Sequence, residues 1–105
     1  MEAVDERLIQ FIPPKHLLTD LERAFQRAGI PLESVETTPD GWLLKGHKGE
    51  NSVNVYLSTR VQVVPLLRVF GPIPVSKLKT VMQGTEEFIR RFKHSLDVSL
   101  LRCLG

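Results

Sequence analysis

The sequence is poor in the residues that usually report on export, disulfide bonding or catalysis. It has one cysteine, one tryptophan and one tyrosine among 105 residues. A single cysteine, Cys103, cannot form an internal disulfide, which fits a reducing compartment. No apolar run reaches the roughly 18 residues that a membrane-spanning helix needs, and the first residues, MEAVDER, carry acids where a signal peptide carries positive charge. We therefore expect a cytoplasmic protein without a transmembrane segment, with peripheral membrane association left open.

Signatures of catalysis and metal binding are missing as well. His16, His47 and His94 fall in separate predicted elements with no HxxxH or CxxC spacing, so a metal site would have to be assembled by folding from isolated ligands. No His or Asn is placed in the sequence to activate Cys103. No glycine loop ends in Lys-Ser or Lys-Thr, and the HRD and DFG signatures of a kinase catalytic domain do not occur. We expect a protein that is not an enzyme and that binds no metal or cofactor.

The chain has the length of one domain. Its residues are 42% hydrophobic and 25% charged, which is ordinary for a globular protein with a modest core. We expect a single domain over residues 1–105, with residues 1–6 disordered. The net charge of +2 hides a split, because the first 44 residues hold eight acids and four bases, whereas the remainder holds ten bases and four acids. A basic second half favours an anionic partner.

Residues 52–70, SVNVYLSTRVQVVPLLRVF, carry the strongest β pattern. Their odd-numbered positions form an apolar row in which only Thr59 is polar, so one face is predicted to be buried. A straight strand of this length would span about 60 Å at roughly 3.3 Å per residue, too long for a domain of this size. The stretch must therefore fold back at residues 58–60 or end near Pro65. The row comprises Val53, Val55, Leu57, Thr59, Val61, Val63, Pro65, Leu67 and Val69.

Two helices are predicted outside this stretch. The first begins at Pro14 and ends before Gly29, with one apolar face and an opposite face of mixed charge that is typical of a solvated surface. The second begins after Thr85, whose hydroxyl precedes two acids in the first turn, and keeps a helical period to Cys103. The apolar face of the first helix comprises Leu17, Leu18, Leu21, Ala24, Phe25 and Ala28, and its charged face comprises Lys15, Asp20, Glu22, Arg23 and Arg27.

The remaining segments are predicted to be strands and turns. Residues 7–12 form an extended segment that two prolines end. The sequence Thr-Pro-Asp-Gly at 38–41 is a hairpin turn, and a second polar turn at 47–51 leads into residues 52–70. Prolines 72 and 74 predict an irregular crossing that is neither helix nor central strand. Residues 77–83 fit a helix face and a strand equally well.

The order of these elements resembles the kinase-associated 1 (KA1) domain, a module at the C-termini of some serine/threonine kinases of the AMP-activated-like group. The family's basic strand, glycine, aromatic residue and basic amphipathic helix look like Lys77, Lys79, Gly84, Phe88, Arg90, Arg91 and Lys93. The resemblance implies that residues 77–83 are a strand. The fold is then α+β, a single antiparallel sheet of four to five strands with two helices packed on one face, in the order β-α-β-β-β-β-α. The resemblance also implies membrane recruitment and autoinhibition of a kinase domain.

Basic residues are the candidates for a binding site. On a helix alone they are typical of a solvated rim, but joined to two lysines on a neighbouring strand they would form one patch. We expect a regulatory module whose patch binds anionic lipid headgroups or an acidic protein surface, such as that of a kinase catalytic domain. The candidate ligand-binding residues are Lys77, Lys79, Arg90, Arg91 and Lys93, with Lys45, Lys48 and Trp42 as secondary candidates.

Two alternative functions remain. A small nucleic-acid-binding domain would place the same basic residues on phosphates and stack Trp42 or Tyr56 on bases. A plain oligomerisation domain would need no basic patch. Trp42 also has a structural interpretation, in which it covers the edge of the sheet.

Overall fold

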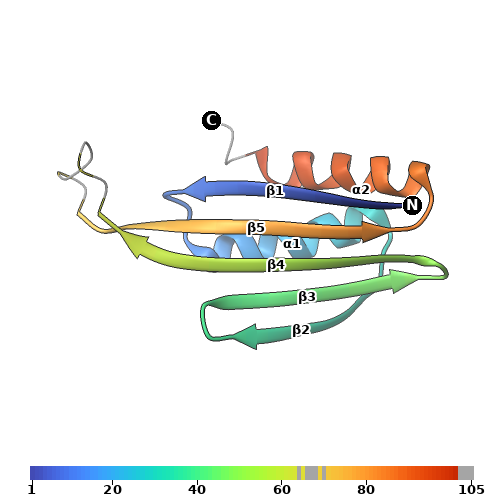
Figure 1. The fold of residues 1–105 in the computed structure, drawn as a ribbon, viewed down its shortest axis with the longest axis horizontal. Helices are drawn as coiled ribbons and strands as arrows, with labels where there is room; N and C mark the ends of the chain where they lie inside the picture. Colours follow the sequence, from blue (N-terminus) through green and yellow to red (C-terminus); the bar gives the residue numbers. More distant parts are fainter. Residues whose placement is uncertain (64, 66–68, 70, 102–105) are drawn as a thin grey trace.

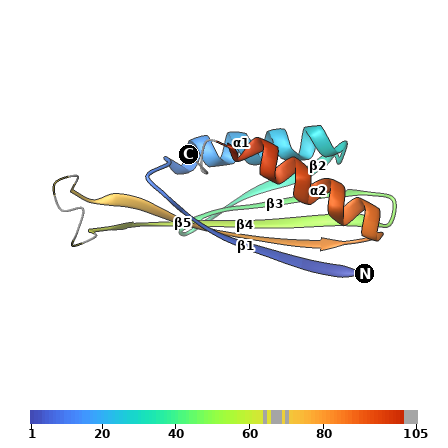
Figure 2. The ribbon, with the colours of Figure 1, turned by 90° about the horizontal axis from the view of Figure 1, so that it is seen from above.

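The chain folds into one five-stranded antiparallel sheet with two helices on a single face (Figures 1 and 2). The structure is a computed structural model and describes residues 1–63, 65, 69 and 71–101. The strands lie in the order β1-β5-β4-β3-β2, and every neighbouring pair is antiparallel. The elements are β1 (Glu2–Gln10), α1 (Pro14–Ala28), β2 (Leu32–Thr38), β3 (Gly41–Lys48), β4 (Asn51–Gln62), β5 (Ile73–Gln83) and α2 (Glu86–Ser99). The predicted α+β class and the order β-α-β-β-β-β-α are confirmed.

Strand β4 lies at the centre of the sheet and supplies much of the core. Val53, Val55 and Leu57 are fully buried under the helices. The strand runs straight through residues 58–60 and ends at Gln62, so the hairpin at 58–60 is excluded. The prediction that the whole odd-numbered row is buried is wrong, because Val61 and Val63 are 70% and 55% exposed. The end of β4 lies where the sheet extends past the helices (Figure 2).

Strand β1 corrects the prediction that residues 1–6 are disordered. It begins at Glu2, opposite Gln83, and continues in register with β5 to Gln10, opposite Val75. Apolar alternation is weak in this segment because Asp5 and Arg7 occupy positions that face the helices. Arg7 donates hydrogen bonds to Asp5 and to Asp97 of α2, and these bonds help to hold the strand where an apolar row is missing. The observed strand thus begins five residues before the predicted segment at 7–12 and ends two residues before the end of that segment.

Helix α1 begins and ends as predicted, and Gly29 closes it with a left-handed φ of 72°. The prediction that Asp20 lies on the solvated face of α1 is wrong, because this residue is only 1% exposed. Asp20 follows Leu17 by three residues and precedes Ala24 by four, so helical geometry sets it on the buried stripe. Its polarity, rather than its spacing, led to the wrong prediction.

The turn chemistry and the second helix also follow the sequence. The chain reverses between β2 and β3 at Pro39-Asp40, and between β3 and β4 at Gly49-Glu50, where Gly49 has a φ of 62°. Thr85 caps α2 by accepting a 3.1 Å hydrogen bond from the amide of Phe88. Cys103, the last residue of the predicted helical period, lies outside the described residues.

Strand β5 resolves the ambiguity at residues 77–83, which are strand throughout. Pro74 also lies in this strand, contrary to the expected irregular crossing. Proline is tolerated there because β5 is paired with β4 at this point, through Val61, whereas its register with β1 begins one residue later. The carbonyl of Pro74 accepts a hydrogen bond from the amide of Phe11.

The two helices pack together over the sheet and close the core. The rings of Phe25 in α1 and Phe92 in α2 meet edge to face, with centroids 5.2 Å apart. Leu78 and Met82 of β5 are buried beneath them. In the part of the chain that the structure describes, no helix is long and apolar enough to cross a membrane.

Candidate interaction surface

The sheet has one face that no described helix or strand covers. Successive side chains of a strand point to opposite faces, so the residues between Val53, Val55 and Leu57 point away from the helices. We call this surface the open sheet face. Its side chains include Val4, Glu6 and Leu8 from β1, Lys77, Lys79 and Val81 from β5, Asn54, Tyr56, Ser58 and Arg60 from β4, and Leu43 and Lys45 from β3.

Tyr56 occupies the middle of the open sheet face. It lies opposite Lys79 on one side and Leu43 on the other. Its side chain is 44% exposed, so both an apolar ring and a hydroxyl are presented to solvent. In the next row, Lys77 lies between Leu8 of β1 and Ser58 of β4. The face therefore combines lysines with apolar side chains, and Glu6 and Glu36 lie at the two ends of the row through Tyr56.

The cations of this face are not neutralised by close carboxylates. Within the described residues, the ion pairs shorter than 4.0 Å involve Arg7 with Asp5 and Asp97, and His47 with Glu33. Lys77, Lys79 and Arg60 take part in none of them. Glu6 lies opposite Lys79 across the β1–β5 pair but is farther away than this limit. These charges are available to an external anion.

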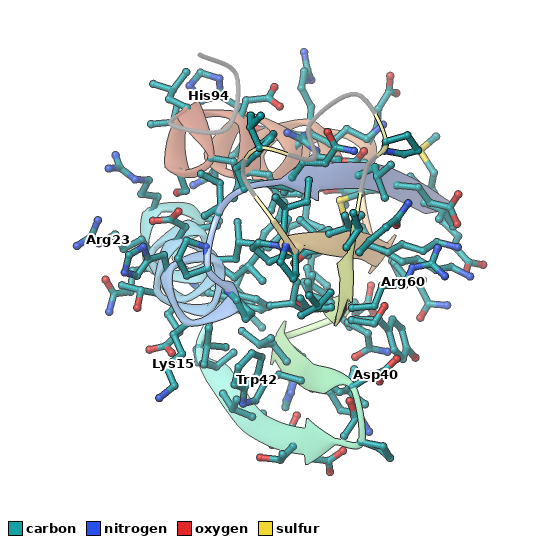
Figure 3. All side chains as sticks on the ribbon, turned by 90° about the vertical axis from the view of Figure 1, so that its left-hand side faces the viewer. Lys15, Arg23, Asp40, Trp42, Arg60 and His94 are labelled. Carbon is teal, nitrogen blue, oxygen red and sulfur yellow. The ribbon has the colours of Figure 1, made fainter. Side chains whose placement is uncertain are left out.

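A shallow hollow of about 300 Å³ opens at the end of this face. Its lining brings two cations, Arg60 and Lys77, together with the hydroxyl-bearing Ser58. Leu8 and Val75 supply an apolar side, and Asp40 adds one carboxylate to the lining. Arg60 points away from the helical layer, whereas Arg23 and His94 lie on the helical side (Figure 3). The combination suits a small anionic group held next to an apolar one.

The five principal candidate residues do not form one patch. Lys77 and Lys79 flank Leu78, which is buried under the helices, so both lysines point to the open sheet face. Arg90, Arg91 and Lys93 are exposed on α2, which covers the opposite face. The sheet thus separates the two groups.

The secondary candidates are also separated. Lys45 lies on the open sheet face between Ser34 and Asn54 and is half-buried. Lys48 lines a different hollow beside α2, where it meets Arg91 but also Glu50 and Glu87, so that hollow has mixed charge.

Trp42 has a structural place in the fold. It pairs with Leu57 and Thr37 on the helix-facing side of the sheet and packs against the core. Its ring is therefore placed to cover the core near the edge of the sheet.

Sequence reasoning missed Ser58 and Arg60 as possible site residues. Both were treated as a polar break in the strand, whereas they are outward positions of an unbroken one. The signal that could have found them is the even-numbered row of residues 52–60, because a buried odd-numbered row requires its even partners to share the other face.

Arg7 is a charged group with a structural rather than an exposed position. It donates from Nη2 to Asp97 Oδ1 at 2.7 Å and from Nε to Asp5 Oδ2 at 3.0 Å. Burial lowers the pKa of Arg7, but the hydrogen bonds to Asp97 and Asp5 outweigh this effect, so that its pKa is raised overall. The residue ties edge strand β1 to α2.

Neither a metal-binding cluster in the described residues nor similarity to known proteins assigns a function to the chain. No group of three His, Cys, Asp or Glu side chains that could hold a metal ion occurs in the described ranges. No protein-family model matches the chain, and a search of curated proteins finds no match. The open sheet face is therefore the feature of the molecule that bears on function.

Proposed function

We propose that the chain is a non-catalytic binding module that docks on an anionic partner through its open sheet face. The observation that carries the proposal is the position of Lys77 and Lys79, exposed and without a close carboxylate, on a face that no described element covers. The partner is an anionic membrane surface or an acidic protein surface. The resemblance to the KA1 domain adds a regulatory role, the recruitment or inhibition of a kinase domain, to this proposal.

Simple electrostatics gives the expected strength. Attraction to an anionic leaflet contributes about 1 kcal/mol for each Lys or Arg near the surface. Lys45, Arg60, Lys77 and Lys79 would together contribute about 4 kcal/mol, reduced by acids such as Glu6 on the same face. Binding should be reversible and sensitive to salt.

Vesicle co-sedimentation tests the lipid form. The chain should pellet with vesicles that contain phosphatidylserine and remain in solution with neutral phosphatidylcholine vesicles. The double variant Lys77→Glu/Lys79→Glu should lower the partition coefficient at least tenfold, because it reverses two charges at the proposed contact. Circular dichroism would check that the variant folds.

Arg90→Glu/Arg91→Glu is the matched control, since it makes the same change of net charge on the helical side of the molecule. It should retain most of the binding. Equal pelleting with neutral vesicles, or an equal loss in both double variants, would contradict the proposed face.

A second candidate function is the binding of single-stranded nucleic acid, and Tyr56 is the observation that favours it. An exposed aromatic ring on a central strand, with a lysine opposite, is a suitable platform for a base next to a phosphate. Stacking is worth roughly 1–3 kcal/mol per base, so Tyr56→Ala should weaken binding of a labelled single-stranded RNA about tenfold in fluorescence anisotropy. Leu43→Ala, the neighbour on the same face, serves as the control. Equal affinities of Tyr56→Ala and Leu43→Ala for the RNA would exclude base stacking on Tyr56.

The plain oligomerisation alternative has a direct test. Sizing chromatography at several protein concentrations should give a single monomeric species if the open sheet face serves a different partner. A stable dimer that Tyr56→Glu dissociates would instead assign this face to self-association.

A further inference from the structure

The end of the β4–β5 pair carries several exposed apolar side chains and no acid. We call it the β4–β5 arm and define it by residues 60–63, 65, 69 and 71–75. Val61, Val63 and Val69 are 70%, 55% and 91% exposed. Figure 2 shows β4 and β5 continuing beyond the layer formed by α1 and α2, in keeping with the high exposure of these valines.

The exposed valines continue a row that is otherwise buried. Val61 and Val63 share the parity of Val53, Val55 and Leu57, which are completely covered by the helices. Full burial of a side chain of this size is worth roughly 1.5–3 kcal/mol relative to exposure. Three such side chains in solvent therefore form a surface that would be stabilised by an apolar environment.

The charges at the base of the arm indicate which apolar environment would cover the exposed valines. The sequence contains no Asp or Glu between Glu50 and Glu86. Arg60 and Lys77 meet in the hollow beside Ser58, and neither has a carboxylate partner within 4.0 Å in the described chain. Asp40 is the acid at that hollow, and it comes from the β2–β3 turn, outside the arm.

A second copy of the chain fits this surface less well than a membrane does. In a symmetric dimer the same patch meets itself, so the two copies would bring together the cations of Arg60 and Lys77 twice over, with only the carboxylate of Asp40 from each copy to neutralise them. An anionic bilayer supplies headgroup phosphates for the cations and an apolar layer for the valines at once.

We infer that the β4–β5 arm enters the interface of an anionic bilayer end on, so that Val61, Val63 and Val69 reach its apolar layer. Arg60 and Lys77, which lie on the opposite face of the strands from Val61 and Val63, bind headgroup phosphates at the base of the arm. This inference rests on the proposed function in its lipid form. It adds a membrane-embedded segment, which separates shallow insertion from electrostatic adsorption on the open sheet face.

The test uses the full chain and phosphatidylserine-containing vesicles. Val61→Thr/Val63→Thr/Val69→Thr keeps the β-branched shape and the net charge while making each side chain polar. The partition coefficient of this triple variant should fall at least tenfold. Val35→Thr, on edge strand β2, replaces another exposed valine and should leave the coefficient unchanged.

A second readout reports insertion directly. In a Cys103→Ser background, an environment-sensitive fluorophore attached through Val63→Cys should shift to the blue on addition of anionic vesicles, while one attached through Val35→Cys should not. Added salt should lower the bound fraction but leave the shift of the molecules that remain bound unchanged, because apolar contacts are not screened.

The possible failures are distinguishable. If the wild-type chain binds anionic vesicles but the triple variant binds equally well and the label at residue 63 stays silent, arm insertion is overturned and the proposed function stands. If the wild-type chain binds no vesicle, the lipid form of the proposed function and the inference are both overturned. If the wild-type chain sediments as a dimer and the triple variant as a monomer, the occupant of the arm is a second copy, and the inference is also overturned.

Discussion

At the scale of single residues, Gly46 marks a close approach of strand β3 to Phe25 of α1 and to Pro31. A Cβ atom at this position would lie 2.7 Å from the carbonyl oxygen of Pro31 and 2.8 Å from the ring of Phe25. Phe25 is itself fully buried against Phe92, so the ring has little room to move. Gly46 is required by this contact rather than by its backbone dihedrals.

Gly46→Ala should therefore lower the free energy of unfolding by about 2 kcal/mol, the usual cost of overpacking a core. Urea denaturation followed by circular dichroism would measure it. Lys45→Ala is the control, because the neighbouring side chain points to the open sheet face and its loss should cost less than about 0.5 kcal/mol. Similar costs for the two variants would show that the core adjusts around a methyl group.

At this scale, features set by local residue identity could be predicted from the sequence, whereas features set by tertiary packing could not. The cap at Thr85 and the left-handed Gly29 follow from local hydrogen bonding and local backbone freedom, so they could be predicted. The burial of Asp20 could not, because it depends on which elements pack against that turn of α1. The close contact at Gly46 is likewise invisible until Phe25 is placed against β3.

At the scale of elements, the ion pair of Arg7 decides how edge strand β1 is held. The strand is hydrogen-bonded on one side only, to β5, and Arg7 adds a link to α2 through Asp97. The carboxylate of Asp97 is 58% exposed and the side chain of Arg7 is 22% exposed, so solvent screens part of the attraction.

A double-mutant cycle should detect this link. Arg7→Ala, Asp97→Ala and the double variant should give a coupling energy of about 0.5–1 kcal/mol in urea denaturation, as partly exposed ion pairs do. A coupling energy of zero would mean that the pair with Asp97 adds nothing to stability and that Arg7 acts only through Asp5 or through packing.

The pH dependence of the Arg7 contribution has a definite sign. The folded state raises the pKa of Arg7, so its contribution is complete below the ordinary pKa of arginine and is lost only as pH rises through the raised value. Titration of Arg7 should therefore not change the stability between neutral pH and the onset of strongly alkaline conditions.

Elements with a regular pattern were predictable from the sequence, and elements stabilised by charge or by neighbours were not. Helix α1 and the two hairpin turns have local signals. Residues 1–6 lack an apolar row, because Asp5 stands where an apolar residue would be expected, and their place in strand β1 depends on pairing with β5. The length of β4 was uncertain because Ser58 and Arg60 look like a break unless the open sheet face is known.

At the scale of the whole molecule, the sheet divides the basic residues into two regions. Lys77 and Lys79 lie on the open sheet face, and Arg90, Arg91 and Lys93 lie on α2 on the far side. The sequence placed all five in one candidate site because it fixes which residues are basic but not which face a strand presents beneath a helix. A flat partner can contact only one of these regions at a time.

This separation predicts which basic residues set the salt dependence of binding. The Debye length falls from about 10 Å at 0.1 M salt to about 3 Å at 1 M, so the wild-type partition coefficient on phosphatidylserine vesicles should fall steeply with salt. Lys77→Glu/Lys79→Glu should flatten this dependence, whereas Arg90→Glu/Arg91→Glu should leave the slope nearly unchanged. Equal slopes in all three proteins would show that no single face carries the electrostatic attraction.

The unbroken course of β4 has a consequence for protein engineering. Asn54, Tyr56, Ser58 and Arg60 are four successive outward positions on a strand whose inward positions 53, 55 and 57 anchor the core. Randomising the outward four would vary a contiguous strip of surface while the buried set stays constant. The domain could thus serve as a small scaffold for selecting new binders, with a library confined to one strand and no loop to redesign.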